Sequence, residues 1–151
     1  MEMTIWIGLA AGLLFILLIA FFLIKKRPDI LEMDQMEGHE FEKYCAKVLA
    51  QHGFQEVEVT KGSGDYGVDI LAEKDGISYA IQCKCYQEPV GVKAIQEVYA
   101  GKDYYDCMVG AVLTNQYFTQ PATDMAKKLN ILLWDRGYLG SMMDEETDGK
   151  I

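Results

Sequence analysis

The sequence predicts one α/β domain, in which helices flank a mixed sheet, preceded by one transmembrane helix. Three observations predict this arrangement. Residues 5–24 form an uncharged apolar run. The roughly 120 residues after it are enough for one domain with one hydrophobic core. In that part a helical pattern is followed by three strand patterns, and helix and strand patterns alternate after them, as in a sheet with crossover helices.

The run IWIGLAAGLLFILLIAFFLI at residues 5–24 predicts a membrane-spanning helix. At about 1.5 Å per residue its length is about 30 Å, the thickness of the hydrocarbon core of a bilayer. Trp6 lies near its start, and the basic cluster Lys25–Arg27 follows its end. A cleaved signal peptide would carry basic residues before a shorter apolar run, so that interpretation fits poorly. The positive-inside rule then predicts a single-pass protein of the cell membrane, with the N-terminus outside and residues 28–151 in the cytoplasm.

The expected cytoplasmic part is acidic. Without Glu2 and the basic cluster, the chain has 11 basic and 22 acidic residues, a net charge of −11. Non-specific binding of nucleic acid depends on a basic surface, so this excess of acidic residues argues against strong non-specific binding of DNA. Part of the excess lies in residues 144–151, which we expect to be a solvated acidic tail.

A helix is expected to open the domain, after a short polar linker at residues 28–37. The apolar residues that follow recur at helical spacing, at Phe41, Tyr44, Cys45, Val48 and Leu49. Gly53 is placed to end this helix.

Three strands are expected next. Val57 and Val59 alternate with polar residues, and a glycine-rich loop follows them. The Asp75-Gly76 pair predicts a tight turn between strands at residues 68–72 and 77–86. Beyond them the pattern predicts helix, strand, helix, strand and helix at residues 92–104, 108–113, 119–129, 131–134 and 136–143. The continuous apolar run MVGAVL is typical of a strand that is buried on both faces.

The four cysteines, Cys45, Cys83, Cys85 and Cys107, are expected to be reduced in a cytoplasmic domain. The Cys-x-Cys pair lacks the spacing of a zinc site, and no second cluster follows it. Strand alternation puts Cys83 and Cys85 on the face that also carries Ile81. We therefore expect this pair to pack in the core.

Asp69, Gln82 and Lys84 are polar residues in otherwise apolar strands. Alternation places Gln82 and Lys84 on one face, opposite the cysteines, and the Asp75-Gly76 turn brings Asp69 close to them. A carboxylate, an amide and an ammonium then converge on one patch of an apolar sheet. Because burying such groups without partners is costly, their convergence predicts a functional site.

The three residues fit the hydrolysis of phosphodiesters. Asp69 and the side-chain oxygen of Gln82 would bind Mg²⁺ or Mn²⁺, and the backbone carbonyl of Cys83 would add a ligand. Lys84 would orient or deprotonate the attacking water, or stabilise negative charge on the phosphorus centre. The predicted chemistry is therefore cation-assisted phosphodiester cleavage.

Further polar residues border this site. One carboxylate supplies little negative charge for a divalent cation, so a second acidic residue is expected. Glu40 and Glu42 of the first helix are both candidates. Asp65 in the glycine-rich loop is a weaker candidate ligand, because aspartate in that position usually shapes the turn. Gln96 on the helix after the site either lines a groove or faces solvent.

The run SGDYGVDILAEKDGISYAIQCKCY, residues 63–86, resembles the Mrr-like (type IV) restriction endonucleases of the PD-(D/E)xK nuclease superfamily. That family has an aspartate in a GVDI strand and a Gln-x-Lys on the next strand, matched here by Asp69 and Gln82–Lys84. A Phe-Glu pair opens its first helix, matched by Phe41-Glu42, which favours Glu42 as the second acid. The runs VGVKAIQEVYAGK, LTNQYFTQPA and LLWDRGYL are also similar, so the resemblance covers about residues 38–140.

The resemblance implies a restriction-endonuclease-like αβββαβ core at residues 38–143 and Mg²⁺-dependent DNA cleavage, often of modified or foreign DNA. The implied catalytic residues are Asp69, Gln82, Lys84 and Glu42. Residues 1–27 would be the anchor with its basic stop. Target recognition would come from a separate subunit or from a homodimer formed through the anchor. The alternative, which the charge of −11 favours, is a DNA-binding or sensor module that keeps the fold without cleavage.

Overall fold

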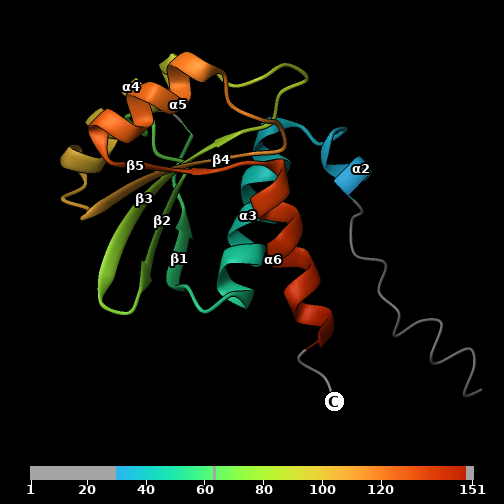
Figure 1. Ribbon diagram of the computed structural model, residues 1–151. Coiled ribbons are helices and arrows are strands. Elements are labelled where there is room, and N and C mark those ends of the chain that lie inside the picture. The colour runs from blue at the N-terminus through green and yellow to red at the C-terminus, as the bar shows by residue number, and fades with distance from the viewer. Residues whose placement is uncertain (1–29, 63, 149–151) are drawn as a thin grey trace, which may run out of the picture.

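The computed structural model describes residues 30–62 and 64–148, so the predicted anchor at residues 5–24 lies outside the described part of the chain. Within those residues, no helix is long and apolar enough to cross a membrane. A five-stranded sheet has helices packed on both of its faces (Figure 1). The elements run in the order α2 (Ile30–Met33), α3 (Gly38–Gln51), β1 (Gln55–Val59), β2 (Ile70–Lys74), β3 (Ile77–Lys84), α4 (Val92–Tyr104), β4 (Val109–Thr114), α5 (Gln120–Leu129), β5 (Ile131–Trp134) and α6 (Arg136–Asp148).

The sheet has the strand order β1-β2-β3-β4-β5 and is mixed, as the sequence predicts. Strands β1, β2 and β3 form an antiparallel meander, while β3, β4 and β5 are parallel. Asp75 and Gly76 close the hairpin between β2 and β3 with φ angles of 54° and 76°, the left-handed pair that a two-residue turn of type I′ requires. Helices α4 and α5 supply the long crossover connections that parallel neighbours need. The predicted order of elements is therefore confirmed from α3 to α6.

Each face of the sheet buries its own apolar cluster. Helices α3 and α6 cover one face, with fully buried members at Phe41, Leu49, Ile70, Ile81 and Leu139. Helices α4 and α5 cover the other face, over a smaller cluster that includes Ile95, Val98, Val112, Ala122 and Ala126. Strand β4 lies between the clusters, because Ala111 and Leu113 belong to the first and Val112 to the second. Its apolar run is thus confirmed as a strand buried on both faces.

Helix α5 begins and ends at residues suited to those positions. The hydroxyl of Thr119 accepts a hydrogen bond from the backbone N–H of Ala122 at 3.3 Å, as an N-cap does. Asn130 follows the helix in the left-handed conformation, with φ 55° and ψ 43°, which ends helices. Strand β5 therefore starts directly after α5, where the sequence predicts it.

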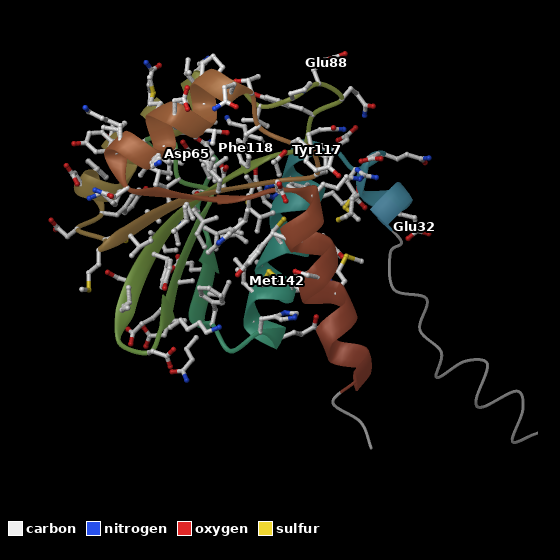
Figure 2. The ribbon with its side chains drawn as sticks, viewed as in Figure 1. Glu32, Asp65, Glu88, Tyr117, Phe118 and Met142 are labelled. Carbon is white, nitrogen blue, oxygen red and sulfur yellow. The ribbon has the colours of Figure 1, made fainter. Side chains whose placement is uncertain are left out.

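The folded part extends beyond both ends of the core expected at residues 38–143. Helix α2 lies in the segment expected to be a linker, and its Met33 is fully buried in the cluster beneath α3 and α6. The thiol of Cys85 donates to the backbone carbonyl of Met33 at 3.3 Å. Helix α6 carries Met142 toward the same cluster (Figure 2), and it continues to Asp148. The packed domain therefore begins by Met33.

Candidate active site

Strand β3 separates three of the four candidate catalytic residues, Asp69, Gln82 and Lys84, from the cluster beneath α3 and α6, whereas the fourth, Glu42, lies on α3 itself. Ile81 belongs to that cluster, so Gln82 and Lys84 project from the opposite face, toward α4. Asp69 precedes β2 and lies opposite Gln82, because its neighbour Ile70 pairs with Ile81. The three residues that the sequence singled out therefore share one face of the sheet.

Asp69 is held in place by β3. Its backbone N–H donates to the carbonyl of Ile81 at 2.8 Å. Its Oδ2 accepts from the backbone N–H of Cys83 at 2.7 Å and from Nε2 of Gln82 at 3.2 Å. Only 8% of Asp69 and 4% of Gln82 is exposed. Neutral donors of the neighbouring strand thus fix this buried carboxylate.

Burial is the main reason why the pKa of Asp69 lies above its ordinary value, and the nearby carboxylates of Glu42 and Asp65 raise that pKa further. Of the two acids on α3, Glu42 therefore acts on Asp69, whereas the pKa of the Cys85 thiol is raised mainly by burial, with a small contribution from the charge of Glu40. This placement favours Glu42 over Glu40 as the second acid. A crowded and desolvated carboxylate is stabilised in its charged form by a cation beside it.

The amide of Gln82 is half satisfied. Its Nε2 donates to Asp69, while its Oε1 is buried and has no hydrogen-bond partner among the described residues. Leaving a buried acceptor unpaired costs about 1–3 kcal/mol. A ligand that accepts lone pairs, such as a cation, would offset that cost.

The oxygen atoms of this site are of the types that bind a hard divalent cation. Asp69 and Glu42 supply carboxylate oxygens and Gln82 an unpaired amide oxygen, which are ligands that Mg²⁺ and Mn²⁺ accept. Oε2 of Glu42 lies 2.8 Å from Nδ1 of the exposed His39, so a cation would compete with that contact. Within the described residues, no three His, Cys, Asp or Glu side chains gather as a metal cluster by themselves.

Lys84 ends β3 and forms an ion pair with α4. Its Nζ lies 3.0 Å from Oε2 of Glu97, and the two side chains are 17% and 30% exposed. Burial acts to lower the pKa of Lys84, but the close approach and the charge of Glu97 outweigh it, so this pKa lies above its ordinary value. Lys84 is therefore an ammonium near neutral pH.

Sequence reasoning did not assign Glu97 a role. It singled out the neighbouring Gln96, which lies exposed on α4. The spacing of Ala94, Glu97 and Gly101 places Glu97 on the buried face of α4. Residues three and four apart share one helix face, and Ala94 and Gly101 are buried. A charged residue between two buried positions of a helix indicates a partner beneath it.

Asp65 shapes the loop that leads to Asp69. Its Oδ1 accepts from the backbone N–H of Gly67 and its carbonyl accepts from that of Val68, both at 3.0 Å, which is the pattern of an Asx turn. Asp65 lies on the side of the sheet that α4 and α5 cover (Figure 2). Its hydrogen bonds hold the loop, and its charge reaches Asp69.

A second polar cluster, here called the clamp, consists of Asp34, Asn115 and Arg136. Nη1 and Nη2 of Arg136 donate to the two carboxylate oxygens of Asp34 at 2.6 and 3.0 Å. The fully buried Asn115 donates to Asp34 at 2.9 Å and exchanges two hydrogen bonds with the backbone of Tyr86, at 2.9 and 3.0 Å. The hydrogen bonds from Arg136 are the main reason why the pKa of Asp34 is lowered. The clamp joins α2, the end of β4 and the start of α6 beside the end of β3.

Known proteins share this fold. The family model Mrr_cat, described as restriction endonuclease, matches residues 33–143, which confirms the resemblance seen in the sequence. No curated protein matches the chain. A protein of unknown function, AF1548, is similar in structure, with a TM-score of 0.56 at 23% identity over 79% of this chain and 71% of its own.

Two restriction endonucleases of known structure also share the fold. MspJI, solved in complex with a 27-mer oligonucleotide, has a TM-score of 0.58 at 20% identity over 74% of this chain. AspBHI, a DNA modification-dependent restriction endonuclease, has a TM-score of 0.56 at 15% identity over 71% of this chain. The match covers 29% of the MspJI chain and 31% of the AspBHI chain, so this chain corresponds to less than a third of each.

Proposed function

We propose that this chain, which belongs to the restriction endonuclease family of the Mrr_cat model, is a divalent-cation-dependent DNA endonuclease. The observation that carries the proposal is the shared face of the buried Asp69 and Gln82 and the partly buried Lys84, on which Oε1 of Gln82 is left without a hydrogen-bond partner among the described residues. The oligonucleotide bound to MspJI supports DNA as the substrate class. The description of AspBHI as DNA modification-dependent supports modified DNA as the target.

The chain's own residues divide the work. Asp69, Glu42, Gln82 and the backbone carbonyl of Cys83 would hold Mg²⁺ or Mn²⁺. When bound, the cation supplies positive charge to the phosphate and makes a water molecule more acidic. Lys84, as an ammonium, would donate to a phosphate oxygen and stabilise the negative charge that develops during attack. The N–H of Cys83 and Nε2 of Gln82 keep the Asp69 carboxylate oriented throughout.

Plasmid cleavage tests this proposal. The full chain, purified in detergent, is incubated with unmodified and with methylated plasmid, in Mg²⁺, in Mn²⁺ and in a chelator. We expect nicking that requires the cation and that disappears in Asp69→Ala and in Lys84→Ala. If the wild type and both variants behave alike, the proposed catalytic site is wrong.

The alternative function is a non-catalytic DNA-binding or sensor module. The charge of −11 outside the N-terminal segment favours it, because an acidic surface gives DNA little non-specific attraction. Gel-shift measurements on the same preparations separate the two functions. Retarded DNA that stays intact with every cation would favour the sensor, whereas cation-dependent nicking would exclude it.

We also propose that residues 5–24 anchor the chain in the cell membrane, with the N-terminus outside and the nuclease domain in the cytoplasm. The support is the uncharged run itself and the basic cluster Lys25–Arg27 after it. Target recognition would then come from a partner subunit or from a homodimer formed through the anchor. Single cysteines introduced at residues 2 and 151 of a cysteine-free chain test the orientation with a membrane-impermeant reagent. Labelling of intact cells is expected at residue 2 alone, and labelling at residue 151 would contradict the orientation.

A further inference from the structure

We propose that Glu97 is a positioning residue for the nuclease reaction, because its carboxylate anchors the Lys84 ammonium on α4. This inference rests on the proposed function and extends it to a residue outside the pattern of Asp69 followed by Gln82-x-Lys84. Glu97 would touch neither the cation nor the phosphate, and it would act through Lys84.

The contact between the two side chains is close and partly shielded from water. Oε2 of Glu97 is buried, and Nζ of Lys84 lies 3.0 Å from it. The approach lies outside the angles of a well-formed hydrogen bond, so attraction between the charges carries the contact. Oε1 of Glu97 lies 3.7 Å from Nζ of Lys93, whose side chain is 87% exposed. The two oxygens of Glu97 therefore face two lysines, and only Lys84 lies on the face of the site.

The backbone of α4 at Glu97 is fixed by the loop that carries Asp69. Gly67 has a φ of 79°, and a Cβ at that position would lie 2.8 Å from Cβ of Glu97 and 3.0 Å from its carbonyl carbon. One helical turn later, a Cβ at Gly101 would lie 2.5 Å from the carbonyl oxygen of Tyr66. Glycine at both positions lets the loop and the helix meet backbone to backbone. The positions of Asp69 and Glu97 are thus set by one contact.

Lys84 and Asp69 share one face of the sheet, and the carboxylate of Glu97 is the acid that contacts the Lys84 ammonium there. Without the charge of Glu97, the ammonium would lose the attraction that holds it beside α4. Glu97 therefore acts on the lysine, and Glu42 remains the candidate for the second acid of the cation site.

Cleavage and binding measured separately test the proposal on the full chain in detergent. Glu97→Gln keeps the shape of the side chain and removes its charge, and Lys93→Ala removes the other lysine that faces Glu97. We expect Glu97→Gln to slow single-turnover cleavage about 100-fold, as a displaced catalytic group does, while the Kd for DNA stays within about twofold. Lys93→Ala is expected to cleave within about twofold of the wild type, because its exposed pair contributes little.

A second measurement does not depend on cleavage. In ¹⁵N-lysine-labelled protein, a paired and shielded ammonium exchanges slowly and gives a side-chain signal, which Lys84→Arg assigns by its loss. We expect this signal in the wild type and in Lys93→Ala, and its loss in Glu97→Gln. Thermal melting checks that each variant folds. If Glu97→Gln does not fold, Glu97→Asp replaces it, because its side chain is one methylene shorter and holds the charge farther from Lys84.

The outcomes separate this inference from the function on which it rests. If the wild type cleaves DNA and Glu97→Gln cleaves equally fast, the positioning role is wrong. If the wild type does not cleave under any condition, the proposed function fails, and the ammonium signal alone decides the pairing. A signal that survives Glu97→Gln overturns the pairing in either case.

Discussion

Two polar clusters lie beside the end of β3, and they differ in how their buried groups are satisfied. In the clamp, the amide oxygen and nitrogen of Asn115 are both bonded, and Arg136 grips both oxygens of Asp34. In the candidate site, Oε1 of Gln82 is buried without a partner among the described residues. A satisfied buried cluster fixes a fold, whereas a partly satisfied one is costly unless something binds to it. We therefore assign the clamp to stability and the site to chemistry.

The largest expected effect is a loss of cleavage that leaves the fold intact. Asp69→Asn keeps an oxygen for the N–H of Cys83 and removes the charge that a cation needs. We expect cleavage to fall about 1000-fold, which corresponds to about 4 kcal/mol of transition-state stabilisation. The melting temperature should stay at or above that of the wild type, because burial disfavours the charged carboxylate. A variant that melts much earlier would show that Asp69 is structural, which would break the comparison.

The second effect should be the reverse, a loss of stability without a change in chemistry. Asn115→Ala removes three hydrogen bonds and leaves the backbone of Tyr86 and one oxygen of Asp34 short of a partner. We expect the free energy of unfolding to fall by about 2–3 kcal/mol, measured by urea titration. Gln96→Ala, on the exposed side of α4, serves as the control and should change it by less than about 0.5 kcal/mol. If Asn115→Ala is as stable as the wild type, the clamp does not stabilise the fold.

The third prediction concerns the contact between the loop and α4. Gly67→Ala adds a Cβ that would lie 2.8 Å from Cβ of Glu97, at a φ of 79°. Gly64→Ala is a matched control, because Gly64 has a φ of 81° and nothing within 4 Å of an added Cβ. We expect Gly67→Ala to lose about 1–3 kcal/mol more stability than the control, and to cleave DNA more slowly. Equal losses in the two variants would mean that the close approach at Gly67 does not position the site.

The smallest expected effects separate the two carboxylates by pH, in the presence of a chelator. The pKa of Asp34 is lowered by its bonds to Arg136, so its contribution to stability is present above the unfolded pKa, about 3.9, and is lost as pH falls through the folded pKa. The pKa of Asp69 is raised, mainly by burial, so its contribution has the opposite sign, and stability is gained as pH falls through its folded pKa.

Urea unfolding midpoints between about pH 3 and pH 7 measure how stability changes with pH for both carboxylates. The slope of stability against pH follows the difference in protons bound by the unfolded and the folded state. Asp34→Asn should flatten the loss at low pH, and Asp69→Asn should flatten the gain above it. Identical pH dependence in the two variants would mean that the two carboxylates do not differ in environment.

The sequence predicted most of the fold because its periodic patterns are local. The Asp75-Gly76 turn fixed the register of β2 against β3, and strand alternation then placed Asp69, Gln82 and Lys84 on one face. The clamp was not predictable in this way. Asp34 meets Asn115 and Arg136 across 81 and 102 residues, and no pattern in one short segment indicates such pairs.

Two other features escaped sequence reasoning for identifiable reasons. Helix α2 has only four residues, too few to show a helical period, so the sequence did not indicate it, although the side chain of Met33 is fully buried. Glu97 has the spacing of a buried position, but its partner depends on how α4 crosses β3, which strand and helix periods do not define. Helix α6 passes residue 143 because the acidic residues there, Glu145 and Glu146, are good helix formers.

The burial of Met33 limits how far the domain can travel from whatever holds residues 1–27. Five residues, 28–32, separate the basic cluster from Met33, so six Cα–Cα steps join Arg27 to Met33, and fully extended they would reach about 22 Å at most. Met33 also lies against Cys85, the residue next to Lys84. If residues 5–24 span a membrane, the short linker keeps the site close to the cytoplasmic surface of that membrane. Tethering then raises the effective concentration of the site for DNA near the membrane and lowers it for DNA elsewhere.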